Sequence, residues 1–273
     1  MSQLEIAPKT IIEACFTPDG TADLAVVYDV AAAVGVADQP VRVAIRRLEA
    51  AGTLHQVGRG RKGHLVLTAG GLAREHADRG YLSLVAAQDR GEATWSGHWH
   101  LYTFSVPERF RSERDALRSA LVRLGAAPLA HGVYVSPFPL RAELEGETSD
   151  RYLITAEALH IAGPGLETPQ RAAETLWPAA EIEAGYAPLS DALDAVASAP
   201  QGASLPERLG CSLRLAEAFS FALERDPLVP PELRGSGWSP PETRRRFRSV
   251  WTALQADLPD VRLFRGYEEF VRP

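Results

Sequence analysis

The sequence predicts an α+β protein of several domains, and three observations lead to this prediction. Residues 39–67 combine a helical pattern with two short apolar segments, and residues 39–64 hold six basic residues against one acid. From Trp95 the composition turns aromatic and favours strands, and beyond Pro164 apolar residues recur at helical spacing. The chain has 273 residues, which is enough for two or three domains of common size.

The composition is that of a soluble globular protein, with 45% hydrophobic and 23% charged residues. No run approaches about eighteen apolar residues, and the N-terminus lacks the basic start and apolar core of a secretory signal. We therefore expect a cytoplasmic protein with no membrane span. Cys15 and Cys211 are too few for a disulfide framework and lack metal-type spacing. The net charge of −6 is an average that conceals the basic window.

The basic window opens with a predicted helix over residues 40–52 that ends at Gly52. Its apolar residues share one face: Val41, Ala44, Ile45 and Leu48. The opposite side offers polar groups to DNA: Gln39, Arg42, Arg46 and Arg47. A helix ending near Gly35 precedes this basic helix, and Asp38 is expected to be the N-cap of the basic helix. Two helices joined by a short turn, the second one basic, indicate a helix-turn-helix.

Residues 54–67 predict a β-hairpin with a basic tip. Glycines at 58, 60 and 63 allow a tight turn, and Arg59, Arg61 and Lys62 offer charge to the DNA backbone or minor groove. A basic hairpin can also be a solvated surface, but after a helix-turn-helix it is typical of the wing of a winged helix. One such module makes few base contacts, so we expect a homodimer on double-stranded operator DNA.

The middle of the chain predicts a small α+β sandwich. Strands are expected at 95–107, 132–136 and 151–155, with 158–161 as a candidate fourth. A helix over 111–124 and a short helical piece over 140–144 connect them, and this order favours a ferredoxin-like fold.

The C-terminal part is predicted to be helical, with apolar stripes over 209–223 and 247–258. The run Arg244 to Arg246 is interpreted as a solvated face, with DNA contact as the alternative. The predicted domains are a winged helix at 1–75, a connector at 76–94, a ferredoxin-like domain at 95–168 and a helical domain at 169–273.

Four stretches of the chain together resemble the PaaX-type transcriptional repressors, a family named for a regulator of phenylacetate degradation. They are PVRVAIRRLEAAGTL with GRGRKGHLVLTAGG, the segment from WSGHWHLYTF to GVYVSP, ETLWPAAEIEAGYAPL with its Trp177 and Tyr186, and FALERDPLVPPEL followed by Trp238. These stretches span most of residues 39–253 in the family's order. The chain departs from the family at its N-terminus and near residues 145–150, where it is shorter.

The resemblance implies a dimeric repressor that a small effector releases from DNA. In the named repressors that effector is an acyl-CoA thioester, so this chemical class is the candidate, while the ligand's identity is not carried over. An effector pocket is expected near four aromatic residues, each of which could equally be core: Trp99, Tyr134, Trp177 or Trp238. A constitutive repressor without an effector is an alternative.

An enzyme is the other alternative, in the form of a metal-dependent nucleic-acid-processing protein built on the middle domain. The domain resembles a CRISPR-associated small nuclease, but Ser105 stands near the place of that family's metal carboxylate. His98 and His100 could bind zinc from one strand face, with His131 as the other candidate ligand. The sequence contains no nucleophile elbow and no P-loop. Gly58, Gly60 and Gly63 match the bare dinucleotide-binding spacing, but they lie in the predicted hairpin and not between a strand and a long helix, so we interpret them as turn residues. We therefore expect no catalytic residue, no metal and no cofactor.

Overall fold

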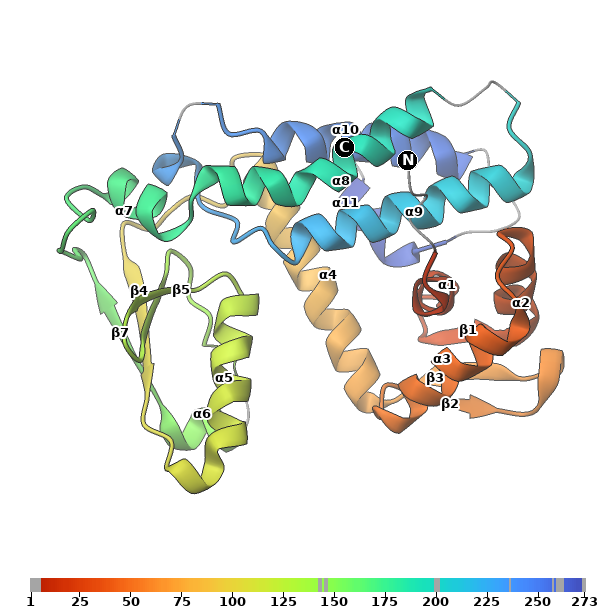
Figure 1. Ribbon diagram of the computed structural model, residues 1–273, viewed down its shortest axis with the longest axis horizontal. Helices are drawn as coiled ribbons and strands as arrows, with labels where there is room; N and C mark the ends of the chain where they lie inside the picture. Colours follow the sequence, from red (N-terminus) through yellow and green to blue (C-terminus); the bar gives the residue numbers. More distant parts are fainter. Residues whose placement is uncertain are drawn as a thin grey trace. The chain divides into compact units, whose positions relative to one another are not determined.

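The computed structural model describes residues 6–141, 144, 147–198, 202–235, 237–256, 258 and 263–271 (Figure 1). The chain forms two compact units, each built from segments that are distant in sequence. The first contains residues 1–83, 187–220 and 242–273, and the second contains 84–186 and 221–241. The four predicted domains divide the chain differently and stay a prediction. Over the described ranges, the helices are too short or too polar to cross a membrane.

The N-terminal part of the first unit combines three helices with a three-stranded antiparallel sheet. In chain order the elements are α1 (Pro8–Ala14), β1 (Thr21–Asp23), α2 (Leu24–Ala33), α3 (Asp38–Ala50), β2 (Leu54–Val57) and β3 (His64–Leu67). The strand order is β1-β3-β2, and β2 and β3 form a hairpin in which Leu54 pairs with Leu67. Val41 and Ile45 of α3 are buried in one hydrophobic core with Leu54 of β2 and Leu65 of β3. The predicted helices and hairpin therefore form where their apolar residues place them.

Asp38 does not cap α3, which corrects the sequence-based expectation. The helix begins one residue earlier because Ala37, with φ −71° and ψ 156°, is already the extended residue that precedes it. Asp38 thus lies in the first turn, where its carboxylate accepts a hydrogen bond from Arg42 at 3.2 Å. At α2 the expected chemistry does occur, since the Asp23 carboxylate accepts from the Ala25 amide at 2.8 Å.

A helix of 21 residues, α4 (Ala69–Asp89), follows β3 without a break through much of the predicted connector at 76–94. Its start passes close to β2, because a Cβ atom on Gly71 would lie 2.1 Å from the Thr53 carbonyl oxygen. Only glycine fits at this crossing.

Three further long helices contribute to the first unit: α8 (Ala179–Ala197), α9 (Leu205–Leu223) and α10 (Pro240–Ala256). The stripe predicted on α9 is buried, and Phe219 stacks on Phe247 of α10 with ring centroids 3.9 Å apart. Glu217 of α9 accepts hydrogen bonds from the amide of Ala7 and the hydroxyl of Thr10, so α9 holds the N-terminal helix α1.

The arginine run on α10 is not a uniformly solvated face, contrary to the interpretation of the sequence. Arg244 is fully buried, whereas Arg245 pairs with Glu242 and Arg246 pairs with Asp194 of α8. Three consecutive helical residues point in different directions, about 100° apart, so one of them faces the core. It is Arg244 because this position precedes the buried Phe247 and Trp251 by three and seven residues, on the same face of the helix.

The second unit contains a four-stranded antiparallel sheet with helices against it (Figure 1). The elements are β4 (Trp99–Phe104), α5 (Arg111–Arg123), β5 (Ala127–Ala130), β6 (Val133–Ser136), α6 (Glu147–Tyr152) and β7 (Leu153–Ala158). The strand order is β5-β6-β4-β7, and the β-α-β-β-α-β succession with this order is the ferredoxin-like arrangement. Leu117 and Leu121 of α5 pack with Tyr102 and Tyr134 of the sheet.

Two details of this sheet differ from the prediction. The sequence APLA was not among the predicted strands, yet it forms β5, an edge strand that joins β6 through a turn at Gly132 with φ 74°. The candidate strand at 158–161 does not form: β7 runs from Leu153 to Ala158, pairs with all six residues of β4, and ends before residues 159–161. Part of the helical piece expected at 140–144 lies outside the described residues.

Candidate nucleic-acid interface and ligand cavity

The polar face predicted on α3 is exposed. Gln39, Arg42, Arg46 and Arg47 all reach solvent, while Val41 and Ile45 of the same helix are buried. Arg42 forms an ion pair with Asp38 one turn earlier, and the Arg46 Nε donates to the Arg42 carbonyl at 3.4 Å. Because these side chains lie on the surface, their charges are solvated and accessible to a large anionic partner.

An open hollow of about 450 Å³ lies between α3 and β2. Its lining residues are Gln39, Arg42, Ile45, Arg46 and Gln56. Gln56 was not among the predicted contact residues. It is held in place by its amide, which donates to the Glu49 carboxylate at 2.9 Å, and by its side-chain Nε2, which donates to the Gly58 carbonyl at 3.0 Å. The sequence places Gln56 in the predicted hairpin, but no local pattern indicates that it lies beside α3.

The tip of the β2–β3 hairpin carries the other three predicted residues, Arg59, Arg61 and Lys62, and all three are exposed. A 3-10 turn over Gly60–Lys62 shapes the tip. Arg61 forms an ion pair with Asp29 of α2 and lies 5.9 Å from the centre of the Tyr28 ring. The structure thus gathers Gln39, Arg42 and Arg46 around one hollow, while Arg47 and the hairpin tip lie outside it.

In the second unit, the residues singled out by the family resemblance contact one another. The Tyr186 hydroxyl donates to the buried Asp226 carboxylate at 2.6 Å, and the Trp177 indole donates to the Gly125 carbonyl at 2.9 Å. Asp226 in turn accepts from the amide of Leu228, a buried residue whose φ of 51° is unusual for a side chain of this size. The two bonds of Asp226 fix the turn that follows α9.

A cavity of about 380 Å³ lies beside this turn. Its lining combines apolar, aromatic and charged residues: Ala173, Glu174, Trp177, Ala179, Glu183, Val229, Leu233, Arg234, Gly235, Gly237 and Trp238. Of the four aromatic residues considered for an effector pocket, Trp177 and Trp238 line this cavity. Trp99 and Tyr134 do not line it. Trp99 is buried against Trp177, with stacked rings 6.2 Å apart, and Tyr134 stacks on Phe104.

Arg234 connects this cavity to the end of α4. Its guanidinium donates to the Val229 carbonyl and to Gln88 of α4, and it lies 5.5 Å from the centre of the Trp238 ring. Gln88 is buried and also donates to the Leu228 carbonyl at 2.6 Å. One wall of the cavity is therefore bonded directly to α4.

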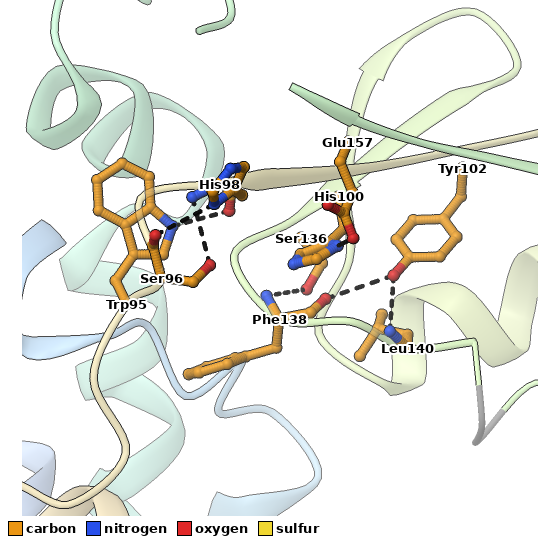
Figure 2. A network of polar contacts seen from close by, with 9 residues as sticks. All are labelled: Trp95, Ser96, His98, His100, Tyr102, Ser136, Phe138, Leu140 and Glu157. Atoms are coloured by element: carbon orange, nitrogen blue, oxygen red, sulfur yellow. Dashed lines mark hydrogen bonds and ion pairs between the residues drawn. The ribbon is translucent and has the colours of Figure 1, made fainter. Parts of the chain in front are cut away.

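The histidines considered as zinc ligands take part in separate contacts (Figure 2). The His98 ring bonds to the Ser96 carbonyl at 3.1 Å, and His100 Nδ1 lies 3.6 Å from the Glu157 carboxylate. Burial lowers the pKa of His100, an effect that Glu157 partly opposes. Within the described ranges, His, Cys, Asp and Glu side chains form no group of three that could hold a metal ion. Ser105 is exposed at the end of β4.

Comparisons with known proteins were made for the sequence and for the structure. Residues 92–172 match the family model described as the PaaX protein central Cas2-like domain. A search of curated proteins gave no match. Among solved structures, the chain is similar to an uncharacterized protein, Rv0674 from Mycobacterium tuberculosis, with 24% sequence identity, a TM-score of 0.53, and coverage of 90% of this chain and 93% of that one. This likeness shows a shared fold over most of the chain.

Proposed function

The central domain at residues 92–172 identifies this chain as a member of the PaaX family of transcriptional regulators, and on this premise we propose that it is a DNA-binding repressor. We propose that it acts as a homodimer on double-stranded operator DNA and that a small effector releases it. The seven predicted residues would contact the DNA: Gln39, Arg42, Arg46, Arg47, Arg59, Arg61 and Lys62.

The observation that carries the proposal is that all six cations of α3 and the β2–β3 hairpin are exposed, within an otherwise acidic chain. The succession α1, β1, α2, α3, β2, β3 with strand order β1-β3-β2 supports our assignment of residues 1–75 as a winged helix. In such a domain α3 would enter the major groove, and the hairpin would reach the backbone or minor groove. The connector, central and C-terminal domains at 76–94, 95–168 and 169–273 are part of the same proposal.

We propose the cavity beside Trp177 and Trp238 as the effector site, with acyl-CoA thioesters as the candidate class. Its volume of about 380 Å³ lies within the range of small-molecule pockets. A thermal-shift screen with acyl-CoA thioesters tests this part, because a ligand that binds the native state raises the melting temperature. If none of them does so, the constitutive repressor becomes the better description.

DNA binding is tested by removing three of the cations together. An operator would first be selected from random double-stranded DNA, and binding would then be measured by fluorescence anisotropy over a range of salt concentrations. For the Arg42→Ala/Arg46→Ala/Arg61→Ala variant we expect weaker binding, and a salt slope reduced by up to about 2.7 if all three side chains contact phosphates.

The matched control removes the same charge from the second unit, in the variant Arg109→Ala/Arg118→Ala/Arg123→Ala. These three arginines are exposed on or beside α5. The control should bind with nearly the wild-type salt slope. Equal affinities for the wild-type chain and the α3–hairpin variant would rule out the assigned DNA surface.

A further inference from the structure

We propose that the hollow between α3 and β2 binds a backbone phosphate of the DNA, and that Gln56 is a DNA-contacting residue. This inference rests on the proposed DNA binding and adds a site and a residue to it. The hollow is lined by two guanidinium groups, two carboxamides and one apolar side chain, Ile45. None of these five described residues contributes a carboxylate, so the lining favours an anion.

The concave shape distinguishes a phosphate from a base edge. Base edges lie recessed in the groove and are reached by side chains that protrude, whereas the phosphates form a raised ridge that fits into a concave surface. A hollow bounded by a helix on one side and a strand on the other is suited to the ridge. The hollow is therefore assigned to the backbone.

The two arginines that border the hollow keep donors for a phosphate oxygen. Each guanidinium has five N–H groups. The ion pair of Arg42 with Asp38 involves one nitrogen, Nη2, and the Arg46 bond to the Arg42 carbonyl involves only Nε. A phosphate can share Arg42 with Asp38, because both partners are exposed and the pair is solvated.

Gln56 is positioned to add a neutral donor to this pair of cations. Its backbone is fixed by the Glu49 carboxylate, and one use of its side-chain amide nitrogen is the bond to Gly58 at the start of the hairpin tip. A carboxamide nitrogen has two N–H groups, so a second one is available to a ligand in the hollow. Glu49 acts only through Gln56 and is a positioning residue.

The decisive variant is Gln56→Lys, which places a cation in the hollow at a half-buried strand position from which a lysine ammonium can reach solvent. If a phosphate occupies the hollow, the new charge makes one more ionic contact and steepens the salt slope by about 0.9. The variant should then lose about threefold more affinity than wild type between about 50 and 200 mM salt.

The matched control is His55→Lys. His55 is exposed on the same strand, but neighbouring strand residues point to opposite faces, so its lysine would lie away from the hollow. The proposal expects a steeper slope for Gln56→Lys alone. An unchanged slope for Gln56→Lys, or the same change in both variants, would overturn it.

A second variant separates backbone contact from base recognition. Gln56→Ala should weaken binding to the selected operator and to an unrelated duplex by the same factor, about fivefold for one lost hydrogen bond. A loss confined to the operator would mean that Gln56 reads a base and would overturn the phosphate assignment. If the wild-type chain binds neither duplex, the proposed function is refuted. If the wild-type chain binds DNA but Gln56→Lys leaves the salt slope unchanged, only the phosphate site is refuted.

Discussion

Replacing Tyr186 by phenylalanine removes a single hydroxyl group from the interior of the second unit. That hydroxyl donates to the Asp226 carboxylate at 2.6 Å, and both residues are buried, at 2% and 5% exposure. The ring itself would remain, so the substitution creates almost no cavity. What changes is the hydrogen bonding of a buried carboxylate that also accepts from the Leu228 amide at 2.8 Å.

A hydrogen bond to a charged group contributes about 1.5–3 kcal/mol, and little water can replace the hydroxyl at so buried a site. We expect Tyr186→Phe to lower the free energy of unfolding of this unit by that amount. The corresponding decrease in melting temperature is roughly 4–10 °C. The turn after α9 should be affected first, because Asp226 holds Leu228 in its uncommon backbone conformation.

Thermal unfolding would give the global effect, and hydrogen exchange followed by mass spectrometry would locate it. Peptides that contain the Leu228 amide should lose protection in Tyr186→Phe. The control is Tyr152→Phe, since the Tyr152 ring is only half-buried, against Phe110, and its melting temperature should stay near wild type. A decrease below about 0.5 kcal/mol, with unchanged exchange at the turn, would show that the bond to Asp226 does not stabilise the unit.

Two further predictions concern titratable groups. Burial raises the pKa of the Cys15 thiol to about 12, whereas Cys211 is partly exposed. A disulfide reagent near neutral pH should therefore label Cys211 first and Cys15 only after unfolding, as mass spectrometry of the peptides would show. Rapid labelling of both thiols in the native chain would contradict this prediction. Burial lowers the pKa of His100 below its usual 6.5, so the imidazole binds a proton more tightly in the unfolded chain than in the folded one. The contribution of His100 to stability is therefore present above pH 6.5 and is lost as the pH falls. Unfolding experiments between about pH 7 and 5 should therefore show a weaker pH dependence for His100→Gln than for wild type, and equal slopes would argue against this effect.

Local patterns predicted much of the fold because they depend on neighbours in sequence. The apolar spacing of Val41 and Ile45 defined the buried face of α3, and glycines at 58 and 63 marked the hairpin turn. The short strand β5 was missed because its alanines and Pro128 have weak strand preference, and only pairing with β6 makes it a strand. Tertiary pairing of this kind leaves little trace in a local pattern.

The candidate interface also contains residues that local sequence patterns predict and one that they do not. The cations were predictable, since charge and helical period suffice to place Arg42 and Arg46 on one exposed face. Gln56 was not, because its proximity to α3 results from the path of the chain through Gly52 and Thr53 and from the bond of its amide to Glu49. The burial of Arg244 could have been predicted, since position 244 precedes the apolar residues Phe247 and Trp251 by three and seven residues and so lies on the same helical face.

The close approach of Gly71 to the Thr53 carbonyl limits how this chain can change during evolution. A side chain at position 71 would place its first carbon atom 2.1 Å from a backbone oxygen, a clash that no rotamer relieves because Cβ is fixed by the backbone. Drift at this position therefore requires α4 and β2 to separate at the same time, which a single substitution does not achieve. Distant chains that keep the crossing should keep this glycine even where most other residues differ, and its loss should mark lineages in which the N-terminal domain has been rebuilt.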